Sequence, residues 1–309
     1  MSHAPGRLIV IDWGTSNFRA FLVDAESGKR LESRRSEAGL RSLSSAEFPH
    51  YCAAQIGDWR EGDDPPPVYL AGMVGSARGW REAPQLDLPV SANDLADHVV
   101  AAPGLDNAWI VPGVKVVTSD QVDVMRGEEI QAFGALAMIG DDTALCCLPG
   151  THSKWVRLEA GRMIDFTTLM TGELYHAVRF HTLPGEPDRG REAFDAEGFE
   201  QGMQAAHHPA GPLHALFEAR SRHLHAGLAA AQVGSFISGV LVGHEARTQR
   251  TLFSGPQRVL LVGSSALNAL YRCALEKVGF EVQEIDSDQA ILAGVCALAR
   301  RHRDDSALT

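Results

Sequence analysis

Two short turns in the sequence combine glycine with hydroxyl side chains, and each follows a strongly apolar run. The first turn contains Gly14, Thr15, Ser16 and Asn17, and the second contains Gly150, Thr151, Ser153 and Lys154. Tight turns that offer backbone N–H groups, with hydroxyls or a cation beside them, bind phosphate groups. We therefore expect both turns to bind the phosphates of a nucleotide.

A carboxylate precedes the first turn, because Asp12 ends the apolar run at residues 8–11. Magnesium keeps much of its water shell in proteins, so Asp12 is suited to hold Mg²⁺ through water. The alternative is that Asp12 accepts N–H groups of its own turn. The sequence contains neither GxxxxGK[ST] nor a GxGxxG after a strand, which excludes a P-loop and a dinucleotide fingerprint.

The elements that would position these turns alternate between strands and helices, which is typical of an α/β protein. Apolar periodicity predicts strands at residues 8–11, 18–22, 68–71, 114–117, 144–148, 154–158, 163–166 and 259–262. It predicts helices at about residues 124–139, at 267–278 and at 288–301.

The two turns share a context of strand, turn and returning strand, which indicates two similar halves. Gly140-Asp141-Asp142 is a plausible boundary. We expect a first domain at 1–140, joined by the C-terminal helix 288–303, and a second domain at 141–287.

Composition narrows the function classes. The chain has 309 residues and a formal charge of −11, which argues against a nucleic-acid or anionic-membrane partner. Five cysteines without CxxC spacing predict a reduced, cytoplasmic protein. The apolar stretch 228–242 is too interrupted for a membrane span. None of the 13 histidines lies in an HExxH spacing, so we expect no histidine metal site.

Longer motifs carry a resemblance to known families. IDWGTSNFRAFLVD, LPGTHSKWV and VLLVGSSALN resemble the two phosphate motifs and the adenosine motif of the sugar kinase, heat-shock protein 70 and actin superfamily. The small-residue segments 234–243 and 290–297 resemble its two connecting helices. More narrowly, GMVGSARGW, DVMRGEE and PGTHSKW resemble the 2-dehydro-3-deoxygalactonokinase family. The resemblance implies two ribonuclease-H-like (actin-like ATPase) domains with an interdomain cleft.

This resemblance also implies an activity: transfer of the γ-phosphoryl group of ATP, with Mg²⁺, to the terminal hydroxyl of a deoxy keto sugar acid. The alternatives are a related kinase for 2-dehydro-3-deoxygluconate or a small sugar, and an actin-like assembly protein controlled by nucleotide. The expected partners are small molecules. The sequence leaves the oligomeric state open, with a homodimer as one possibility.

The resemblance places the general base where the last strand of the first domain passes into a helix. Asp123 is our choice and Asp120 the second choice. The competing interpretation is capping, since acids gather at helix N-termini.

The resemblance also assigns substrate and adenosine contacts. Gly75 and Ser76 would contact sugar hydroxyls, and Arg78, Arg126 or Arg19 would bind the carboxylate. The alternative for Arg126 is a pair with Glu129. Trp80 would form an apolar wall or belong to the core. Thr151, Ser153 and Lys154 would face the β- and γ-phosphates, while the adenosine contacts would come from Gly263, Ser264 and Asn268.

Overall fold

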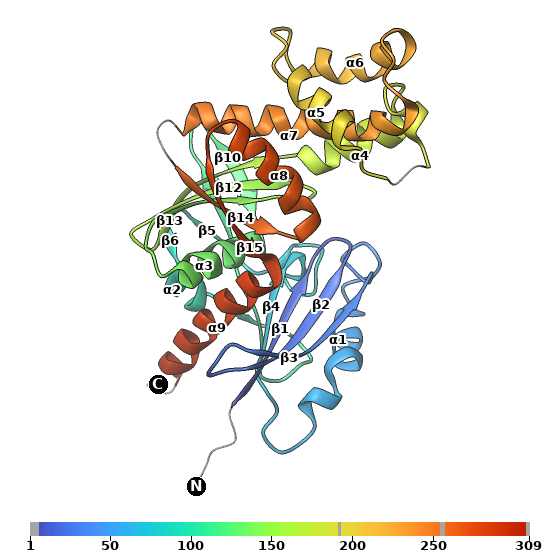
Figure 1. The fold of residues 1–309 in the computed structure, drawn as a ribbon. Coiled ribbons are helices and arrows are strands. Elements are labelled where there is room, and N and C mark those ends of the chain that lie inside the picture. Colours follow the sequence, from blue (N-terminus) through green and yellow to red (C-terminus); the bar gives the residue numbers. More distant parts are fainter. Residues whose placement is uncertain (1–5, 191–192, 254–256, 307–309) are drawn as a thin grey trace. The chain divides into compact units, whose positions relative to one another are not determined.

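The structure is a computed structural model that describes residues 6–190, 193–253 and 257–306 (Figure 1). The chain divides into two compact units. Unit 1 contains residues 1–144, 156–167 and 285–309, and unit 2 contains residues 145–155 and 168–284. The domain limits expected from the sequence stay a prediction.

A six-stranded sheet forms the centre of unit 1, with the order β3-β2-β1-β4-β8-β7 (Figure 1). The strands are β1 (Arg7–Trp13), β2 (Phe18–Asp24), β3 (Arg30–Ser36), β4 (Val68–Gly72), β7 (Val100–Ala101) and β8 (Ala108–Ile110). β1 pairs antiparallel with β2 and parallel with β4. Residues 8–11 of β1 are all buried, as a continuous apolar run requires in the middle of a sheet.

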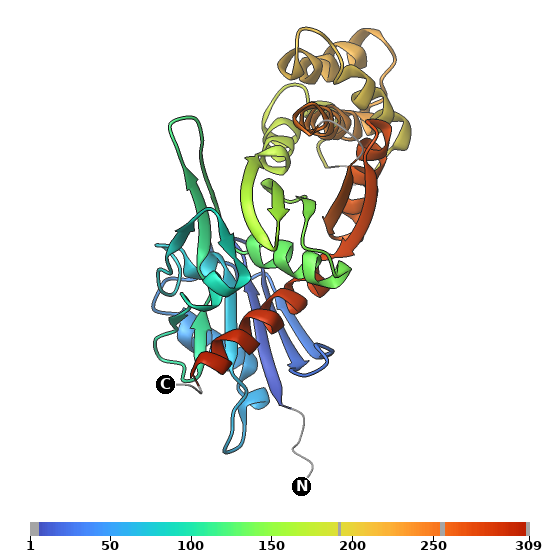
Figure 2. The same cartoon turned by 90° about the vertical axis from the view of Figure 1, so that its left-hand side faces the viewer.

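Other elements of unit 1 surround this sheet. The helices are α1 (Phe48–Ile56), α2 (Ala92–Ala96), α3 (Glu128–Ile139) and α9 (Ser287–Ser306). A second sheet has the order β10-β9-β5, from β5 (Gln85–Asp87), β9 (Gly113–Val117) and β10 (Val122–Met125). Figure 2 shows β9 and β10 as a projecting hairpin.

The third sheet repeats the arrangement of the first, with the order β15-β14-β11-β12-β13-β6. Its strands are β6 (Val90–Ser91), β11 (Ala144–Leu148), β12 (Ser153–Glu159), β13 (Arg162–Leu169), β14 (Arg258–Gly263) and β15 (Glu281–Asp286). β11 pairs parallel with β14, just as β1 pairs parallel with β4.

Both six-stranded sheets therefore contain three strands that follow one another in the chain beside two later strands, and a sixth strand lies at one edge, β7 in the first sheet and β6 in the third. This order, 3-2-1-4-5, is the ribonuclease-H-like order, and it confirms the fold class that the sequence predicts.

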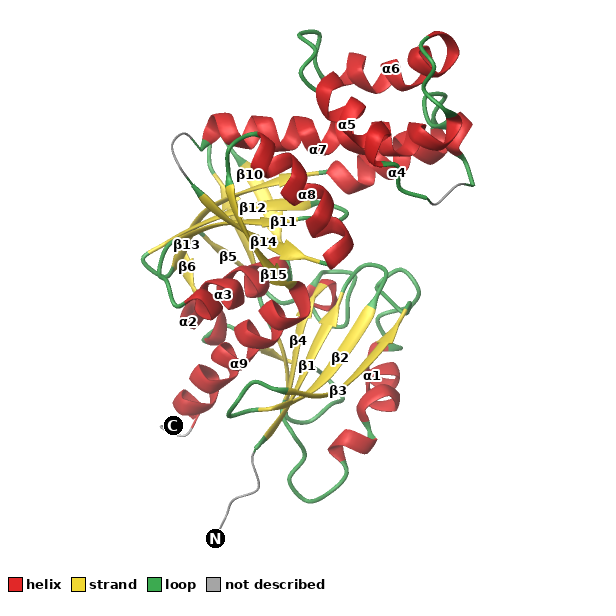
Figure 3. Ribbon diagram, in the orientation of Figure 1, coloured by secondary structure: helices red, strands yellow, loops and turns green. Residues whose placement is uncertain are grey.

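Unit 2 also carries a group of helices, coloured red in Figure 3. They are α4 (Thr171–His181), α5 (Ala196–Ala205), α6 (Pro212–His225) and α7 (Val233–Leu252), and α8 (Ser265–Lys277) follows β14. No helix among the described residues is both long enough and apolar enough to span a membrane.

Helix α3 packs closely against helix α9 through small residues (Figure 2). A Cβ at Gly134 of α3 would lie 1.8 Å from the carbonyl oxygen of Ala290, and one at Gly294 would lie 2.2 Å from the carbonyl oxygen of Ile130. Segment 234–243, which we expected to be a connecting helix, belongs to α7 and packs mainly on α5. Helix α3 is therefore the partner of segment 290–297.

Replacing Gly134 with alanine should lower the melting temperature by about 5 °C or more, because the two helix backbones must separate to admit a methyl group. Calorimetry measures this change. The matched control is Gly6→Ala, whose Cβ would meet no atom within 4 Å. Alanine favours helix over glycine by about 1 kcal/mol, so a rise in melting temperature would show that the close packing is unimportant.

Candidate functional site

The first glycine–hydroxyl turn joins β1 to β2 and borders a cavity. The N–H of Gly14 donates to the carbonyl oxygen of Asn17 at 2.9 Å, which closes the turn. The cavity has a volume of about 410 Å³, and its lining residues are Thr15, Ser16, Asn17, Glu37, Arg41 and Ser42. Hydroxyls, an amide, the guanidinium of Arg41 and the carboxylate of Glu37 thus line the cavity. All of these groups except the Glu37 carboxylate can bind an anionic ligand.

Asp12 lies at the end of β1 and takes part in an ion-pair chain. One of its oxygens, Oδ2, accepts a hydrogen bond from Arg19, whose Nη1 donates to Asp288 of α9 at 2.8 Å. Burial lowers the pKa of Arg19, but the two carboxylates raise it by more, so the guanidinium stays charged. Arg19 therefore forms its ion pairs with carboxylates of the protein itself.

The remaining oxygen of Asp12 fits the magnesium role. Among the described residues, Oδ1 receives no hydrogen bond, and it lies 3.3 Å from the position that a Cβ would take at Gly72. A carboxylate oxygen of this kind can accept a hydrogen bond from a water of hydrated Mg²⁺.

The ends of β1 and β4 lie beside the start of α3. Gly127 has a φ of +109°, which glycine adopts readily, and a Cβ there would lie 3.0 Å from the Cα of Gly72. Gly72 itself has a φ of +94°. The junction between β10 and α3 therefore lies next to the carboxyl ends of two parallel strands, where α/β proteins place ligands.

Asp123 does not lie at that junction. It is the second residue of β10, opposite Val116 of β9, and its carboxylate accepts the N–H of Val124 at 2.8 Å. Asp120 is exposed in the turn between the two strands. The expected helix start near residue 124 is wrong because Val122–Met125 pairs as a strand, and α3 begins at Glu128. Whether Asp123 acts as the base stays a prediction.

The acids at the actual junction are Glu128 and Glu129. Glu128 is partly buried, whereas Glu129 is fully buried and both of its oxygens accept the N–H of Gly127, at 2.8 and 2.7 Å. Burial raises the pKa of Glu129 to about 8, with a further contribution from the charge of Glu128. The hydrogen bond from Gly127 and the charge of Arg126 oppose the rise.

The buried Glu129 should make stability depend on pH. Its folded pKa of about 8 exceeds the ordinary value of 4.5, so the folded state retains a proton that the unfolded state has lost. Stability then falls as pH rises from about 4.5 to about 8. Glu129→Gln does not titrate, so we expect its stability relative to wild type to improve by about 3 kcal/mol between pH 5.5 and 8.5.

Urea unfolding at the two pH values measures that difference. Asp120→Asn is the control, since it makes the same exchange of carboxyl for amide at an exposed position in a turn. A Glu129→Gln difference that is independent of pH would contradict the buried, proton-retaining carboxyl group.

The motif GMVGSARGW forms a compact loop after β4, and Arg126 lies against it. A Cβ at Gly75 would meet Nη1 of Arg126 at 2.9 Å. Nη2 of Arg126 donates to the carbonyl oxygen of Ala83 at 2.8 Å, while Nη1 is buried and has no hydrogen-bond partner among the described residues. The hydroxyl of Ser76 is likewise buried, and no residue in the described part of the chain forms a hydrogen bond with it. The loop thus brings together two unsatisfied polar groups.

Trp80 and Arg78, the other two residues of this loop that we expected to contact substrate, differ in their burial. Trp80 is 7% exposed, packs in the hydrophobic core and donates its indole N–H to the carbonyl oxygen of Pro103 at 2.9 Å. This agrees with the alternative that Trp80 belongs to the core, and whether Trp80 also contacts the substrate stays a prediction. Arg78 is exposed.

In unit 2, the second glycine–hydroxyl turn packs on the start of α4. A Cβ at Gly172 would lie 2.3 Å from the carbonyl oxygen of Gly150, and the N–H of Glu173 donates to the carbonyl oxygen of Thr151 at 2.8 Å. His152 pairs with Glu173 at 2.8 Å. Thr151 is exposed, so its hydroxyl is accessible beside a helix N-terminus, a favourable place for an anion.

The side chain of Ser153 does not face this surface. It is fully buried, and its hydroxyl lies 2.7 Å from the hydroxyl of Tyr271. This corrects the expected phosphate contact of its side chain. Lys154 is 5% exposed, and its ammonium donates to Thr168 at 2.8 Å. A buried ammonium with a neutral partner favours a nearby anion, so its phosphate contact stays a prediction.

A buried carboxylate, which we did not predict from the sequence, lies next to this turn. Glu245 of α7 accepts hydrogen bonds from Trp155, Thr171 and Tyr271. Burial raises its pKa, although these hydrogen bonds oppose the rise. Because Thr171 begins α4, this network holds the helix start against the turn. The only sequence signal for a buried carboxylate here is a single Glu within an otherwise apolar helix pattern.

The adenosine motif lies at the same sheet edge as the second turn. β11 and β14 are parallel, with Cys147 opposite Leu261, so Pro149 and Gly263 are neighbours. Ser264 caps α8. Asn268 is 3% exposed, and its Oδ1 is buried with no hydrogen-bond partner in residues 6–190, 193–253 and 257–306. The expected adenosine residues therefore lie together and retain an unsatisfied acceptor.

Two ribonuclease-H-like sheets, each with a glycine–hydroxyl turn after its first strand, define an actin-like ATPase fold. The family model for 2-keto-3-deoxy-galactonokinase matches residues 12–298. The chain belongs to this family.

Individual relatives agree with this assignment. The 2-dehydro-3-deoxygalactonokinase of Escherichia coli (strain K12) is 37% identical over 95% of this chain and 97% of its own. A relative from Rhizobium meliloti (strain 1021), named for the same activity, is 36% identical over 96% of this chain and 97% of its own.

A crystal structure of a Sinorhizobium meliloti protein, also named for that activity, superposes with a TM-score of 0.85 at 35% identity. It covers 95% of this chain and 96% of the other.

Proposed function

We propose that the protein transfers the γ-phosphoryl group of ATP to the terminal hydroxyl of 2-dehydro-3-deoxygalactonate, giving the 6-phosphate and ADP. Family membership supports the reaction class. The observation that carries the sugar-acid assignment is the pair of buried, unpartnered groups beside Gly75, Nη1 of Arg126 and the hydroxyl of Ser76.

A keto sugar acid offers what these two groups lack. Its carboxylate can accept from the guanidinium, and one of its hydroxyls can pair with Ser76. Burial lowers the pKa of Arg126, although Glu129 and Glu82 oppose the shift, so this cation is incompletely solvated. An anionic ligand would restore the lost solvation, which favours Arg126 over the exposed Arg78.

The nucleotide would use the remaining groups. In unit 2, we assign the adenosine to Gly263, Ser264 and Asn268, and phosphates to Gly150, Thr151 and Lys154. In unit 1, we assign a phosphate to the 14–17 turn. Mg²⁺, held through water by Asp12, would neutralise phosphate charge when bound. That one triphosphate uses both turns remains a prediction from the sequence.

The chemical step asks for one carboxylate near the accepting hydroxyl. The hydroxyl oxygen bonds to the γ-phosphorus, the bond to the β-phosphate oxygen breaks, and the base takes the hydroxyl proton. We propose Asp123 as this base, since it shares a face of β10 with the buried Met125 and precedes Arg126 by three residues. Glu128 is the second candidate because it occupies the strand-to-helix junction.

A coupled ADP-release assay tests the reaction and the base together. We expect Asp123→Asn to lower kcat by about 100-fold or more with little change in KM, because it removes proton acceptance and preserves shape. Asp120→Asn tests the second choice made from the sequence, and we expect it to retain activity because Asp120 lies in the exposed turn of the same hairpin. Loss of activity in Asp120→Asn alone would assign the base to Asp120.

If Glu128→Gln loses activity and Asp123→Asn does not, the base is Glu128. If 2-dehydro-3-deoxygluconate is the better substrate, the related kinase is correct. ADP release that is independent of any sugar acid would overturn the kinase proposal and favour a nucleotide-controlled assembly protein.

The carboxylate assignment has its own test. Arg126→Met should raise KM for the sugar acid about tenfold or more, because a charge-assisted hydrogen bond is lost, while KM for ATP changes little. Arg78→Met is the matched control and should change KM for the sugar acid less than about threefold. The reverse result would assign the carboxylate to Arg78.

A further inference from the structure

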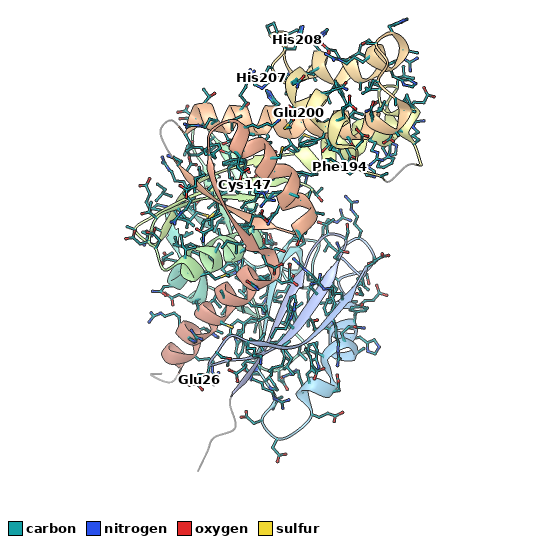
Figure 4. All side chains as sticks on the ribbon, viewed as in Figure 1. Glu26, Cys147, Phe194, Glu200, His207 and His208 are labelled. Atoms are coloured by element: carbon teal, nitrogen blue, oxygen red, sulfur yellow. The ribbon has the colours of Figure 1, made fainter. Side chains whose placement is uncertain are left out.

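A histidine–carboxylate cluster lies in unit 2, apart from the residues assigned to ATP and the sugar acid. His208 lies in the loop between α5 and α6, and His214 and Glu218 lie one helical turn apart on α6. One ligand atom from each residue lies within 4.8 Å of the other two. Figure 4 labels His208 and its neighbour His207 near the end of α5.

The carboxylate of Glu218 is oriented by an arginine. Its Oε2 accepts from Nε and Nη2 of Arg222, both at 2.6 Å, whereas Oε1 lies 3.2 Å from Nε2 of His214. Tetrahedral zinc ligands at about 2.0–2.1 Å from the metal are about 3.4 Å from each other. His214 and Glu218 already have this spacing, and Arg222 is the kind of outer partner that fixes a ligating carboxylate.

The ring of His208 completes the cluster. Its centroid lies 4.2 Å from that of His214, with an angle of 34° between the planes. Its Nδ1 accepts the N–H of Ala210 at 3.1 Å, which fixes the ring. Coordination through Nδ1 would replace this single backbone hydrogen bond, so only a small local movement is needed.

We propose that His208, His214 and Glu218 bind one divalent transition-metal cation of the zinc type, with water as a further ligand. Two imidazoles and one carboxylate suit zinc, whereas magnesium prefers oxygen ligands and water. The bound cation would connect the loop after α5 to helix α6. This site is therefore structural and separate from the nucleotide's magnesium, and it does not depend on the proposed reaction.

The spacing is visible in the sequence as HALFE, a histidine and a glutamate four residues apart on one helix face. A search for HExxH does not find it, and the third ligand comes from a different segment. The expectation of no histidine metal site therefore changes once the loop and the helix are brought together.

The test is calorimetric titration of the full chain, prepared without a histidine tag, with Zn²⁺. We expect one Zn²⁺ per chain at this site and at least tenfold weaker binding in both His208→Gln and His214→Gln. The matched control is His207→Gln, whose exposed side chain is adjacent in sequence and outside the cluster; its Kd should stay within twofold of wild type.

A melting-temperature rise with Zn²⁺ that is lost in the same two variants, with unchanged Mg²⁺-dependent activity, would further support the site. The proposal is overturned if wild type binds no Zn²⁺ at submillimolar concentration, if His207→Gln loses as much affinity, or if excess Mg²⁺ displaces the bound Zn²⁺.

Discussion

The close approach of Gly72 and Gly127 determines the geometry of the site in unit 1. Two residues with positive φ meet there, and any side chain at Gly127 would press on the backbone of Gly72. This contact places the start of α3 beside the end of β4 and near the carboxylate of Asp12. The positions of Arg126, Glu128 and Glu129 all follow from it.

A second consequence concerns buried charge. Arg126 and Glu129 lie on either side of Gly127 in the chain, and both lose solvation through burial. Burial acts against the charged form of both groups, so a ligand that brings an opposite charge gains more here than at the surface. Unit 2 also contains a buried carboxylate, but its charge is stabilised within the protein. Glu245 accepts three hydrogen bonds, which hold the start of α4 in place.

The sequence predicted strands well where a run was uniformly apolar, as in β1, β4, β11 and β14. The sequence-based prediction was wrong at residues 122–125, because their apolar pattern is compatible with either a strand or the first turn of a helix. These residues form a strand because they pair with β9. The side chains of Trp80 and Ser153 are buried, which the motifs could not show: a motif indicates that a residue is near a site but not to which side its side chain points.

The sequence by itself determined the α/β class, the two glycine–hydroxyl turns and the family, because these depend on local periodicity and on residue types at fixed spacing. Only the tertiary structure decided which polar groups of the described residues are left unsatisfied, that Arg126 lies beside Gly75, and that His208 lies close to His214 and Glu218 of α6. Those facts depend on contacts between distant segments, and burial, which sets the energy of each polar group, exists only after the chain has folded.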